Sequence, residues 1–348
     1  MIDWTSDETH LLLNPRLPEG ERQRLEKLAA DAPPLPGHLL LATSGTTGSL
    51  KLTALSKRAM LISAAAVNRH LGSTAEDLWC CVLPTFHVGG LGIYARAHLS
   101  GARVVAAPWD AREFVRLCRE ERVTLASLVP AQVRDLAGLE APSSLRAIVV
   151  GGGAFRERVE GWPLLPSYGM TECCSQVATA RPGSGDLLLL DHVEARQEED
   201  GRLALRSEAL LSGYLTEETG FADPKRDGWF VTEDVGRVEG AYLRVEGRLG
   251  DFVKIGGESV DLGRLDRILA SIAGSDAAVF AVPDTRLGHV IHLAVAAGDA
   301  EAIAARFDRE VLPFERARAV HRVPRIPRSA LGKLMRKALL EMLPKSVE

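Results

Sequence analysis

Apolar runs of strand length alternate with helical patterns between residues 78 and 150, and this alternation constrains the fold more than any other feature of the chain. The expected strands span Leu78–Leu83, Arg103–Ala107, Thr124–Val129 and Leu145–Val150, and the expected helices between them span Leu91–Leu99, Asp110–Arg122 and Ala131–Leu139. This order predicts a parallel sheet with helices on both faces. Ligands bind at the carboxyl ends of the strands in such sheets, so residues that follow a strand are the first candidates for a site.

The flanking regions follow other patterns. A short charged helix is expected over Glu21–Ala30, and Ser56 is expected to cap a helix that ends at Leu71. From Leu187 to Val245 short strands and turns predict hairpins in a smaller antiparallel layer. We therefore expect an α/β fold with a large domain over residues 1–249. A small α+β domain over residues 250–348 is expected to follow it.

Composition narrows the class of function. The 348 residues carry a net charge of -4, which gives no broad basic surface for nucleic acid. The five cysteines have neither metal-ligand spacing nor the pattern of a disulfide framework, as is typical of a reducing compartment. The first residues are acidic, and no apolar run reaches membrane-spanning length. We expect a cytoplasmic enzyme that acts on small molecules and has no membrane span.

One segment, Thr43–Lys51, is suited to a polyanion. It reads T-S-G-T-T-G-S-L-K, has no acidic residue and lies between two apolar runs. Glycines let backbone N–H groups approach oxygen atoms, hydroxyls add donors, and Lys51 adds a positive charge. The spacing of Gly45, Gly48 and Lys51 does not fit a Walker A loop. A flexible linker is the alternative for such a composition.

Three further polar segments follow expected strands. His87 lies in Pro84–Gly90; a lone histidine is more often structural, but its position after a strand favours ligand binding. Three glycines in Gly151–Phe155 would by themselves indicate only a tight turn. In Ser167–Glu172 the aromatic ring of Tyr168 can stack on a base, and the carboxylate of Glu172 can bind Mg²⁺. An irregular loop with incidental polar residues is the alternative there.

The second half of the chain adds charged candidates. Asp234 can accept hydrogen bonds from both hydroxyls of a ribose, and Arg248 can bridge ribose or phosphate oxygens. The pair Glu233-Asp234 would more often indicate a solvated turn. Lys333 lies in the basic segment Pro327–Arg336, where by position alone a solvated helix face is the stronger interpretation.

Taken in order, these segments resemble the motifs of the acyl-adenylate-forming family, which includes acyl-CoA synthetases. The resemblance covers the chain from about Leu39 onward. It implies that a carboxylic acid and Mg-ATP give an acyl-adenylate, from which a thiol such as that of coenzyme A displaces AMP. The expected small-molecule partners are therefore a carboxylic acid, ATP and CoA, with Mg²⁺ as cofactor. The family also implies a mobile C-terminal domain that carries a catalytic lysine.

The resemblance assigns roles to individual residues of this sequence. It implies catalytic roles for Lys333, Thr171 and Glu172, with Glu172 also the Mg²⁺ ligand. It implies nucleotide binding by Thr43, Ser44, Gly45, Thr46, Thr47, Gly48, Lys51, Gly152, Gly153, Ala154, Tyr168, Gly169, Met170, Asp234 and Arg248. It implies binding of the acid or of CoA by His87, Val88, Gly89, Ser175, Gln176, Lys254, Gly256 and Gly257.

The chain departs from the family pattern at three places. Glu233 stands where glycine is usual, Gly250 stands at the hinge where aspartate or lysine is usual, and only 42 residues precede Thr43. The last departure predicts a shortened N-terminal part, and a homo-oligomer could cover the surface left exposed.

The choice of acid depends on one segment. Residues Tyr168–Gln176 are similar to those of o-succinylbenzoate–CoA ligases of menaquinone biosynthesis, which makes this the preferred activity. Three alternatives stay open. They are another aryl or fatty acid–CoA ligase, an enzyme that loads a carrier protein, and a non-catalytic nucleotide-binding protein.

Overall fold

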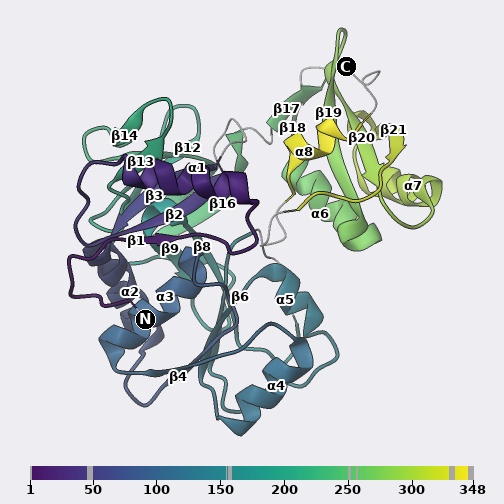
Figure 1. Ribbon diagram of the computed structural model, residues 1–348. Coiled ribbons are helices and arrows are strands. Elements are labelled where there is room, and N and C mark those ends of the chain that lie inside the picture. The colour runs from purple at the N-terminus through teal and green to yellow at the C-terminus, as the bar shows by residue number, and fades with distance from the viewer. Residues whose placement is uncertain are drawn as a thin grey trace. The chain divides into compact units, whose positions relative to one another are not determined.

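The computed structural model describes residues 2–44, 50–153, 155, 159–249, 252–255, 258–328 and 334–343. The chain forms two compact units, traced by colour from N- to C-terminus in Figure 1. The first unit comprises residues 1–199, 203–232 and 237–244, and the second comprises residues 200–202, 233–236 and 245–348.

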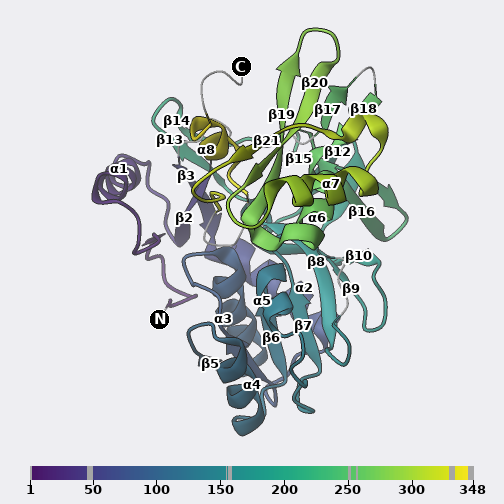
Figure 2. The same cartoon turned by 90° about the vertical axis from the view of Figure 1, so that its right-hand side faces the viewer.

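A parallel sheet forms the centre of the first unit, with the strand order β5-β4-β6-β7-β8. Its strands are β4 (Leu78–Cys81), β5 (Arg103–Ala106), β6 (Leu125–Leu128), β7 (Ala147–Val150) and β8 (Leu164–Met170). Its helices are α2 (Lys57–Leu71), α3 (Val88–Ser100), α4 (Ala111–Glu120) and α5 (Pro130–Asp135). The expected parallel α/β core is confirmed, and Figure 2 shows these helices beside the strands.

Alternate side chains of these strands enter two different cores, because successive residues of a strand point to opposite faces. Cys80 and Ile148 belong to the core that also contains Phe114 of α4. Trp79 and Val149 belong to the core that contains residues of α2 and α3. All four strand side chains are buried. This explains why the strands read as uninterrupted apolar runs in the sequence.

Antiparallel strands continue this sheet beyond β8 in the order β9-β10-β16-β15-β12-β11. They are β9 (Ser175–Ala180), β10 (Leu187–Leu189), β11 (Glu194–Gln197), β12 (Arg202–Arg206), β15 (Phe230–Glu239) and β16 (Tyr242–Arg248). The 3-10 helix η1 (Thr171–Cys173) joins β8 to β9. The hairpins expected from the turn-rich sequence are therefore present.

A second sheet has the strand order β1-β2-β3-β13-β14. Its strands are β1 (His10–Leu12), β2 (His38–Ser44), β3 (Leu50–Ser56), β13 (Gly213–Thr216) and β14 (Gly220–Ala222). Helix α1 (Glu19–Ala30) contributes Leu25 and Leu28 to a core shared with Leu40 and Leu52 of this sheet. Residues 213–216 thus lie beside β3, although some 160 residues of sequence separate the two strands.

The second unit has a sheet of its own, with the order β18-β17-β20-β19 and with β21 paired to β20. Its strands are β17 (Phe252–Ile255), β18 (Glu258–Asp261), β19 (Ala277–Asp284), β20 (Gly288–Val295) and β21 (Ala317–Arg322). Its helices are α6 (Leu262–Ala273), α7 (Ala300–Glu310) and α8 (Arg336–Glu341), with the 3-10 helices η3 (Gly274–Asp276) and η4 (Pro313–Glu315). Side chains of α6 and α7 share one core with the sheet, and Leu339 of α8 belongs to another.

Some boundaries differ from expectation. Helix α3 begins at Val88 rather than Leu91, because Gly89 and Gly90 continue the helix. A Cβ on Gly90 would lie 2.4 Å from the carbonyl oxygen of Pro84, so only glycine fits that first turn. Helix α2 does begin after Ser56, whose hydroxyl accepts a hydrogen bond from the N–H of Ala59.

All five cysteines are free and buried. No helix in the described ranges is both long and apolar enough to cross a bilayer.

Candidate active site

The sheet formed by β1, β2, β3, β13 and β14 carries polar side chains on one of its two faces. Thr43 pairs with Lys51 across β2 and β3, and Tyr214 of β13 pairs with Thr53. Because side chains two residues apart share a face, Lys51, Thr53 and Tyr214 lie on the same side. The hydroxyls of Thr43 and Thr53 are hydrogen-bonded at 2.9 Å. The intervening Leu52 turns to the opposite face, where it packs in the core under α1.

Lys51, Tyr214 and Glu172 form a connected group. The ammonium of Lys51 lies 3.2 Å from the centroid of the Tyr214 ring. The Tyr214 hydroxyl donates a hydrogen bond to Oε1 of Glu172 at 2.9 Å. Burial lowers the pKa of Lys51, and the charge of Glu172 acts in the opposite direction. Lys51 and Glu172, which are predicted to bind the same nucleotide, are thus connected through Tyr214. Tyr214 was not among the residues predicted from the sequence.

The backbone around Glu172 is held in place from two sides. Thr171 and Glu172 follow Met170, the last residue of β8, in the single turn of η1. The carbonyl of Glu172 accepts a hydrogen bond from the N–H of Leu211 at 2.7 Å, just before β13. No group of three or more His, Cys, Asp or Glu side chains among the described residues could hold a metal by itself. One carboxylate fits Mg²⁺ nonetheless, because this ion commonly takes one or two carboxylates plus phosphate oxygens.

The turn after η1 is strained. Cys174 has φ of 53° and Ser175 has φ of 110°, values that residues with a side chain rarely adopt. Gly169 lies opposite, at an irregularity between β8 and β9. A Cβ on Gly169 would lie 1.7 Å from the carbonyl oxygen of Ser175, so only glycine allows this approach. The turn directs the hydroxyl of Ser175 toward α3.

The side chain of Arg96 in α3 is hydrogen-bonded to the hydroxyl of Ser175. Its guanidinium donates to Oγ of Ser175 at 3.2 Å and to Oγ of Ser127 at 3.4 Å. Arg96 is 1% exposed, and burial lowers its pKa to about 10. Its described partners are neutral hydroxyls and the ring of Trp79, with no carboxylate in ion-pair contact. A buried cation without a counter-ion is costly, so this position is suited to an anionic ligand group.

Two predicted acid-binding side chains adjoin α3 and β9, the two elements that the Arg96–Ser175 hydrogen bond joins. His87 precedes α3, with Val88 and Gly89 in its first turn, and Gln176 follows Ser175 in β9. Nε2 of His87 and both amide atoms of Gln176 are buried without a hydrogen-bond partner among the described residues. Burial also lowers the pKa of His87, which favours the neutral imidazole. Unpaired buried polar atoms of this kind commonly serve a ligand or ordered water.

The glycines predicted to line the adenine pocket follow β7. Gly152 has φ of +82°, and a Cβ there would lie 3.4 Å from Val129. Gly153 follows it directly, and Tyr168 lies on β8, the neighbour of β7 in the sheet. A side chain at residue 152 would therefore be strained for backbone reasons alone.

Asp234 and Arg248 form a pair of their own within the second unit. Nε of Arg248 donates to Oδ1 of Asp234 at 2.7 Å, from the end of β16 to β15. Asp234 is buried, whereas the side chain of Arg248 is 45% exposed. Glu233 points the other way along the strand and is more than half exposed. The departure at Glu233 therefore leaves the adjacent carboxylate buried and paired.

Several predicted residues fall outside the described ranges. They are Gly45, Thr46, Thr47, Gly48, Ala154, Gly256, Gly257 and Lys333. The backbones of Ser44 and Lys254 are described, in β2 and β17, but their side chains are not. Tyr214 and Arg96 were not among the residues predicted from the sequence. Arg96 is the one charged residue between Val88 and Ala97, which is the signal that could have indicated its burial.

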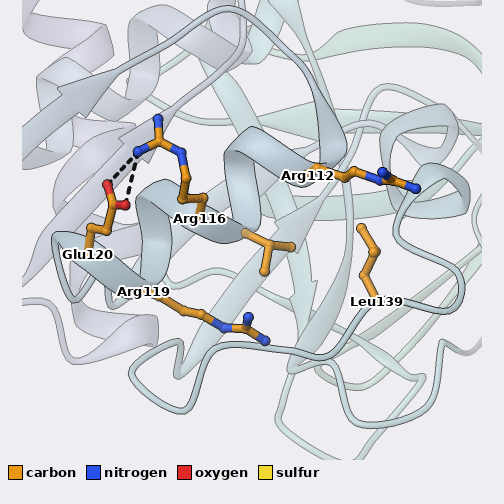
Figure 3. Close-up of a pocket in the computed structure, with 6 residues that line it drawn as sticks. Arg112, Arg116, Arg119, Glu120 and Leu139 are labelled. Atoms are coloured by element: carbon orange, nitrogen blue, oxygen red, sulfur yellow. Dashed lines mark hydrogen bonds and ion pairs between the residues drawn. The ribbon is translucent and has the colours of Figure 1, made fainter.

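A surface pocket between α4 and the segment at Leu139 is separate from these groups. Its volume is about 420 Å³, and it is lined by Arg112, Val115, Arg116, Arg119, Glu120 and Leu139 (Figure 3). Arg116 pairs with Glu113 and Glu120, and Arg119 contacts Glu140. Because most of its cationic charge is compensated locally, this pocket does not compete with the group around Lys51 as a candidate site.

The sequence is similar to that of known enzymes. Residues 7–215 match the model of the AMP-binding enzyme family. The 2-succinylbenzoate–CoA ligase of Bacillus licheniformis is 31% identical over 332 residues, covering 86% of this chain and 69% of the relative. The enzyme of the same name from Enterococcus faecalis is 29% identical, covering 85% of this chain and 67% of the relative.

Solved structures give the same result. The o-succinylbenzoate CoA synthetase of Bacillus subtilis in complex with the acyl-adenylate intermediate OSB-AMP aligns with a TM-score of 0.78 at 26% identity. The alignment covers 86% of this chain and 68% of that structure. The same synthetase in complex with ATP and magnesium ion also aligns with a TM-score of 0.78 at 26% identity. This alignment covers 87% of this chain and 69% of that structure.

Proposed function

The chain belongs to the AMP-binding enzyme family, and we propose that it is an o-succinylbenzoate–CoA ligase of menaquinone biosynthesis. It uses ATP, Mg²⁺ and coenzyme A and works through an acyl-adenylate. The relatives from Bacillus licheniformis and Enterococcus faecalis carry this ligase activity in their names. The synthetase of Bacillus subtilis has been solved with an acyl-adenylate and with ATP and magnesium ion.

The observation that carries the proposal is the group formed by Lys51, Tyr214 and Glu172. In the first step a carboxylate oxygen of the acid attacks the α-phosphorus of ATP, and the bond from that phosphorus to pyrophosphate breaks. Lys51 binds phosphate oxygens, and Thr171 donates a hydrogen bond to one of them. Glu172 would hold Mg²⁺, which neutralises phosphate charge. Lys333 contacts both reacting anions and lowers the barrier that their repulsion creates.

In the second step the thiolate of CoA attacks the acyl carbon, and the bond from that carbon to AMP breaks. The glycines at 152 and 153 and Ala154 give the adenine room beside Tyr168, while Asp234 and Arg248 hold the ribose. Lys254 and the glycines at 256 and 257 line the path of the pantetheine chain. Residues 1–249 form the domain that binds ATP and acid, and residues 250–348 form a mobile domain that carries Lys333 and turns about Gly250.

Arg96 supports the identity of the acid. An o-succinylbenzoate ion has two carboxylates, and activation of one of them leaves the other charged. A buried site needs a cation for it, and Arg96 is a buried cation without a described carboxylate partner. Ser175, Gln176 and His87 supply neutral polar atoms around it. A monocarboxylic acid would leave the charge of Arg96 uncompensated.

The proposal is tested by incubating the purified protein and Mg-ATP with a panel of acids and measuring release of pyrophosphate and AMP with and without CoA. We expect pyrophosphate release with o-succinylbenzoate alone and stoichiometric AMP release only after CoA is added. A preference for another aryl or fatty acid would reassign the substrate. Transfer to a carrier protein but not to CoA would reassign the acceptor. No release with any acid would indicate a non-catalytic nucleotide-binding protein. We further propose a cytoplasmic location.

A further inference from the structure

We propose that Tyr214 is a positioning residue for nucleotide binding. Its ring holds the ammonium of Lys51, and its hydroxyl holds the carboxylate of Glu172, so one side chain fixes the separation of the phosphate-binding cation and the metal-binding carboxylate. The inference rests on the proposed function, because it assumes that both charged groups meet the same Mg-polyphosphate.

The position of Tyr214 is determined by backbone contacts on both sides of its strand. Across β13 it pairs with Thr53 of β3 on one side and with Ala222 of β14 on the other. The preceding Gly213 allows this arrangement, because a Cβ there would lie 2.7 Å from the carbonyl oxygen of Ala222. The ring is thus attached to a strand that cannot shift without breaking two sets of pairing hydrogen bonds.

The two contacts of the side chain have different chemistry and can be separated by substitution. The contact to Lys51 uses the negative face of the ring, which phenylalanine retains. The contact to Glu172 uses the phenolic hydroxyl, which phenylalanine lacks. Tyr214→Phe therefore releases the carboxylate alone, and Tyr214→Leu releases both charged groups.

Release of the carboxylate should appear in the metal dependence of nucleotide binding. A hydrogen bond to a charged group contributes about a tenfold factor to an equilibrium constant, which sets the expected size of the effect. We expect Tyr214→Phe to raise the Mg²⁺ concentration for half-maximal ATP binding about tenfold. ATP affinity at saturating Mg²⁺ should stay within about twofold of the wild-type value. Under that condition Mg²⁺ already holds the Glu172 carboxylate in place, so the hydrogen bond from Tyr214 is no longer needed to orient it.

Release of the ammonium should appear without any nucleotide. In the free protein the Tyr214 ring covers Lys51, so an amine-reactive reagent should modify Lys51 at least about threefold faster in Tyr214→Leu than in wild type. The Tyr214→Phe variant should react at the wild-type rate. Peptide mass spectrometry gives the rate at Lys51, and reaction at the other lysines of the same sample gives an internal reference.

The experiment combines calorimetric titration of ATP at several Mg²⁺ concentrations with this labelling. Tyr242→Phe and Tyr242→Leu are matched controls, because Tyr242 lies on β16 and is 51% exposed. Circular dichroism establishes that each variant is folded, and Tyr214→Phe keeps the test decisive if Tyr214→Leu does not fold.

Wild-type Mg²⁺ dependence in Tyr214→Phe would overturn the role toward Glu172. Equal labelling in Tyr214→Leu would overturn the role toward Lys51. A wild-type protein that binds no ATP would overturn the proposed function, and with it the nucleotide role, whatever the labelling shows.

Discussion

Arg96 in α3 donates a hydrogen bond to the hydroxyl of Ser175 in β9, 3.2 Å away, and so joins the helix that follows His87 to the strand that follows Glu172. Two backbone features make this contact possible. The left-handed turn at Cys174 and Ser175 directs the hydroxyl inward. Gly92 leaves room for the guanidinium, because a Cβ there would lie 3.2 Å from Nη2 of Arg96.

If Arg96 holds the second carboxylate of the acid, its removal should affect the acid and not the nucleotide. We expect Arg96→Met to raise KM for o-succinylbenzoate at least about thirtyfold, the size of one lost charged hydrogen-bond pair, with KM for ATP within about twofold. Steady-state kinetics of pyrophosphate release gives both constants. Arg69→Met, which removes an exposed arginine of α2, is the matched control. Equal increases in both constants would assign Arg96 a structural role only.

Lys333 should serve only the first half-reaction. Deleting one preorganised group that stabilises transition-state charge costs about a hundredfold or more, so we expect Lys333→Ala to lose that much in adenylation. Thioester formation from supplied acyl-adenylate and CoA should change much less. Rapid-quench measurement of each half-reaction separates the two. Arg325→Ala removes an exposed basic side chain eight residues earlier in the sequence and should leave both rates unchanged. A similar loss in both half-reactions would contradict the assignment.

The ion pair between Asp77 and Arg146 should stabilise the first unit. Asp77 is buried and accepts hydrogen bonds from Arg146, from the hydroxyl of Thr124 and from the N–H of Thr74. Burial acts to raise the pKa of Asp77, but these donors outweigh it and the pKa is lowered. We expect Asp77→Ala to reduce the free energy of unfolding by about 2–3 kcal/mol, because it leaves the donors unpaired.

Urea denaturation followed by tryptophan fluorescence measures this loss. The control is Asp191→Ala, which breaks an arginine–aspartate pair of similar geometry whose side chains are both more than half exposed. An exposed pair contributes less than about 1 kcal/mol, so this variant should change little. Equal effects of the two substitutions would show that burial does not determine the strength of the pair.

His192 should make the protein less stable in acid. Burial lowers its pKa to about 4 in the folded state, and neither ring nitrogen has a partner among the described residues. Between this value and about 6.5 the unfolded chain binds the proton more tightly, so the free energy of unfolding falls as pH falls. From pH 7 to pH 5 the contribution is at most about 2 kcal/mol.

Denaturation at both pH values compares wild type with His192→Leu, which cannot titrate. We expect the variant to lose less stability on acidification, while His98→Leu, which removes an exposed histidine, should follow the wild type. A His192→Leu slope equal to that of the wild type would show that this imidazole does not titrate differently on unfolding.

Local patterns predicted much of the fold. The run from Leu78 to Val150 gave the right strands and helices in the right order, since apolar period and turn residues are properties of adjacent positions. Ends of elements were less accurate: α5 stops at Asp135 and not Leu139. Trp79 and Cys80 point to opposite faces of β4, and both are buried. Because both faces are buried, the sequence of this strand is a continuous apolar run.

Nonlocal contacts could not be predicted in the same way. Nothing near Tyr214 in the sequence indicates that its strand lies beside Lys51, because that pairing depends on the path of the intervening chain. The apolar surroundings of Arg96 in the sequence could have indicated that it is buried, but only the fold reveals its contacts with Ser127 and Ser175. Of the charged residues predicted by resemblance, Lys51 and Glu172 are joined through Tyr214 and Asp234 is paired with Arg248, while their shared function stays a prediction.

The central claim is that this protein activates an acid as its adenylate before any thiol takes part. Exchange of labelled pyrophosphate into ATP tests it most directly, because exchange requires reversible formation of the acyl-adenylate and no CoA. We predict exchange that depends on both o-succinylbenzoate and Mg²⁺ in the absence of CoA, and that is lost in Lys333→Ala. Exchange that is absent with every acid tried, or that requires CoA, would contradict the account.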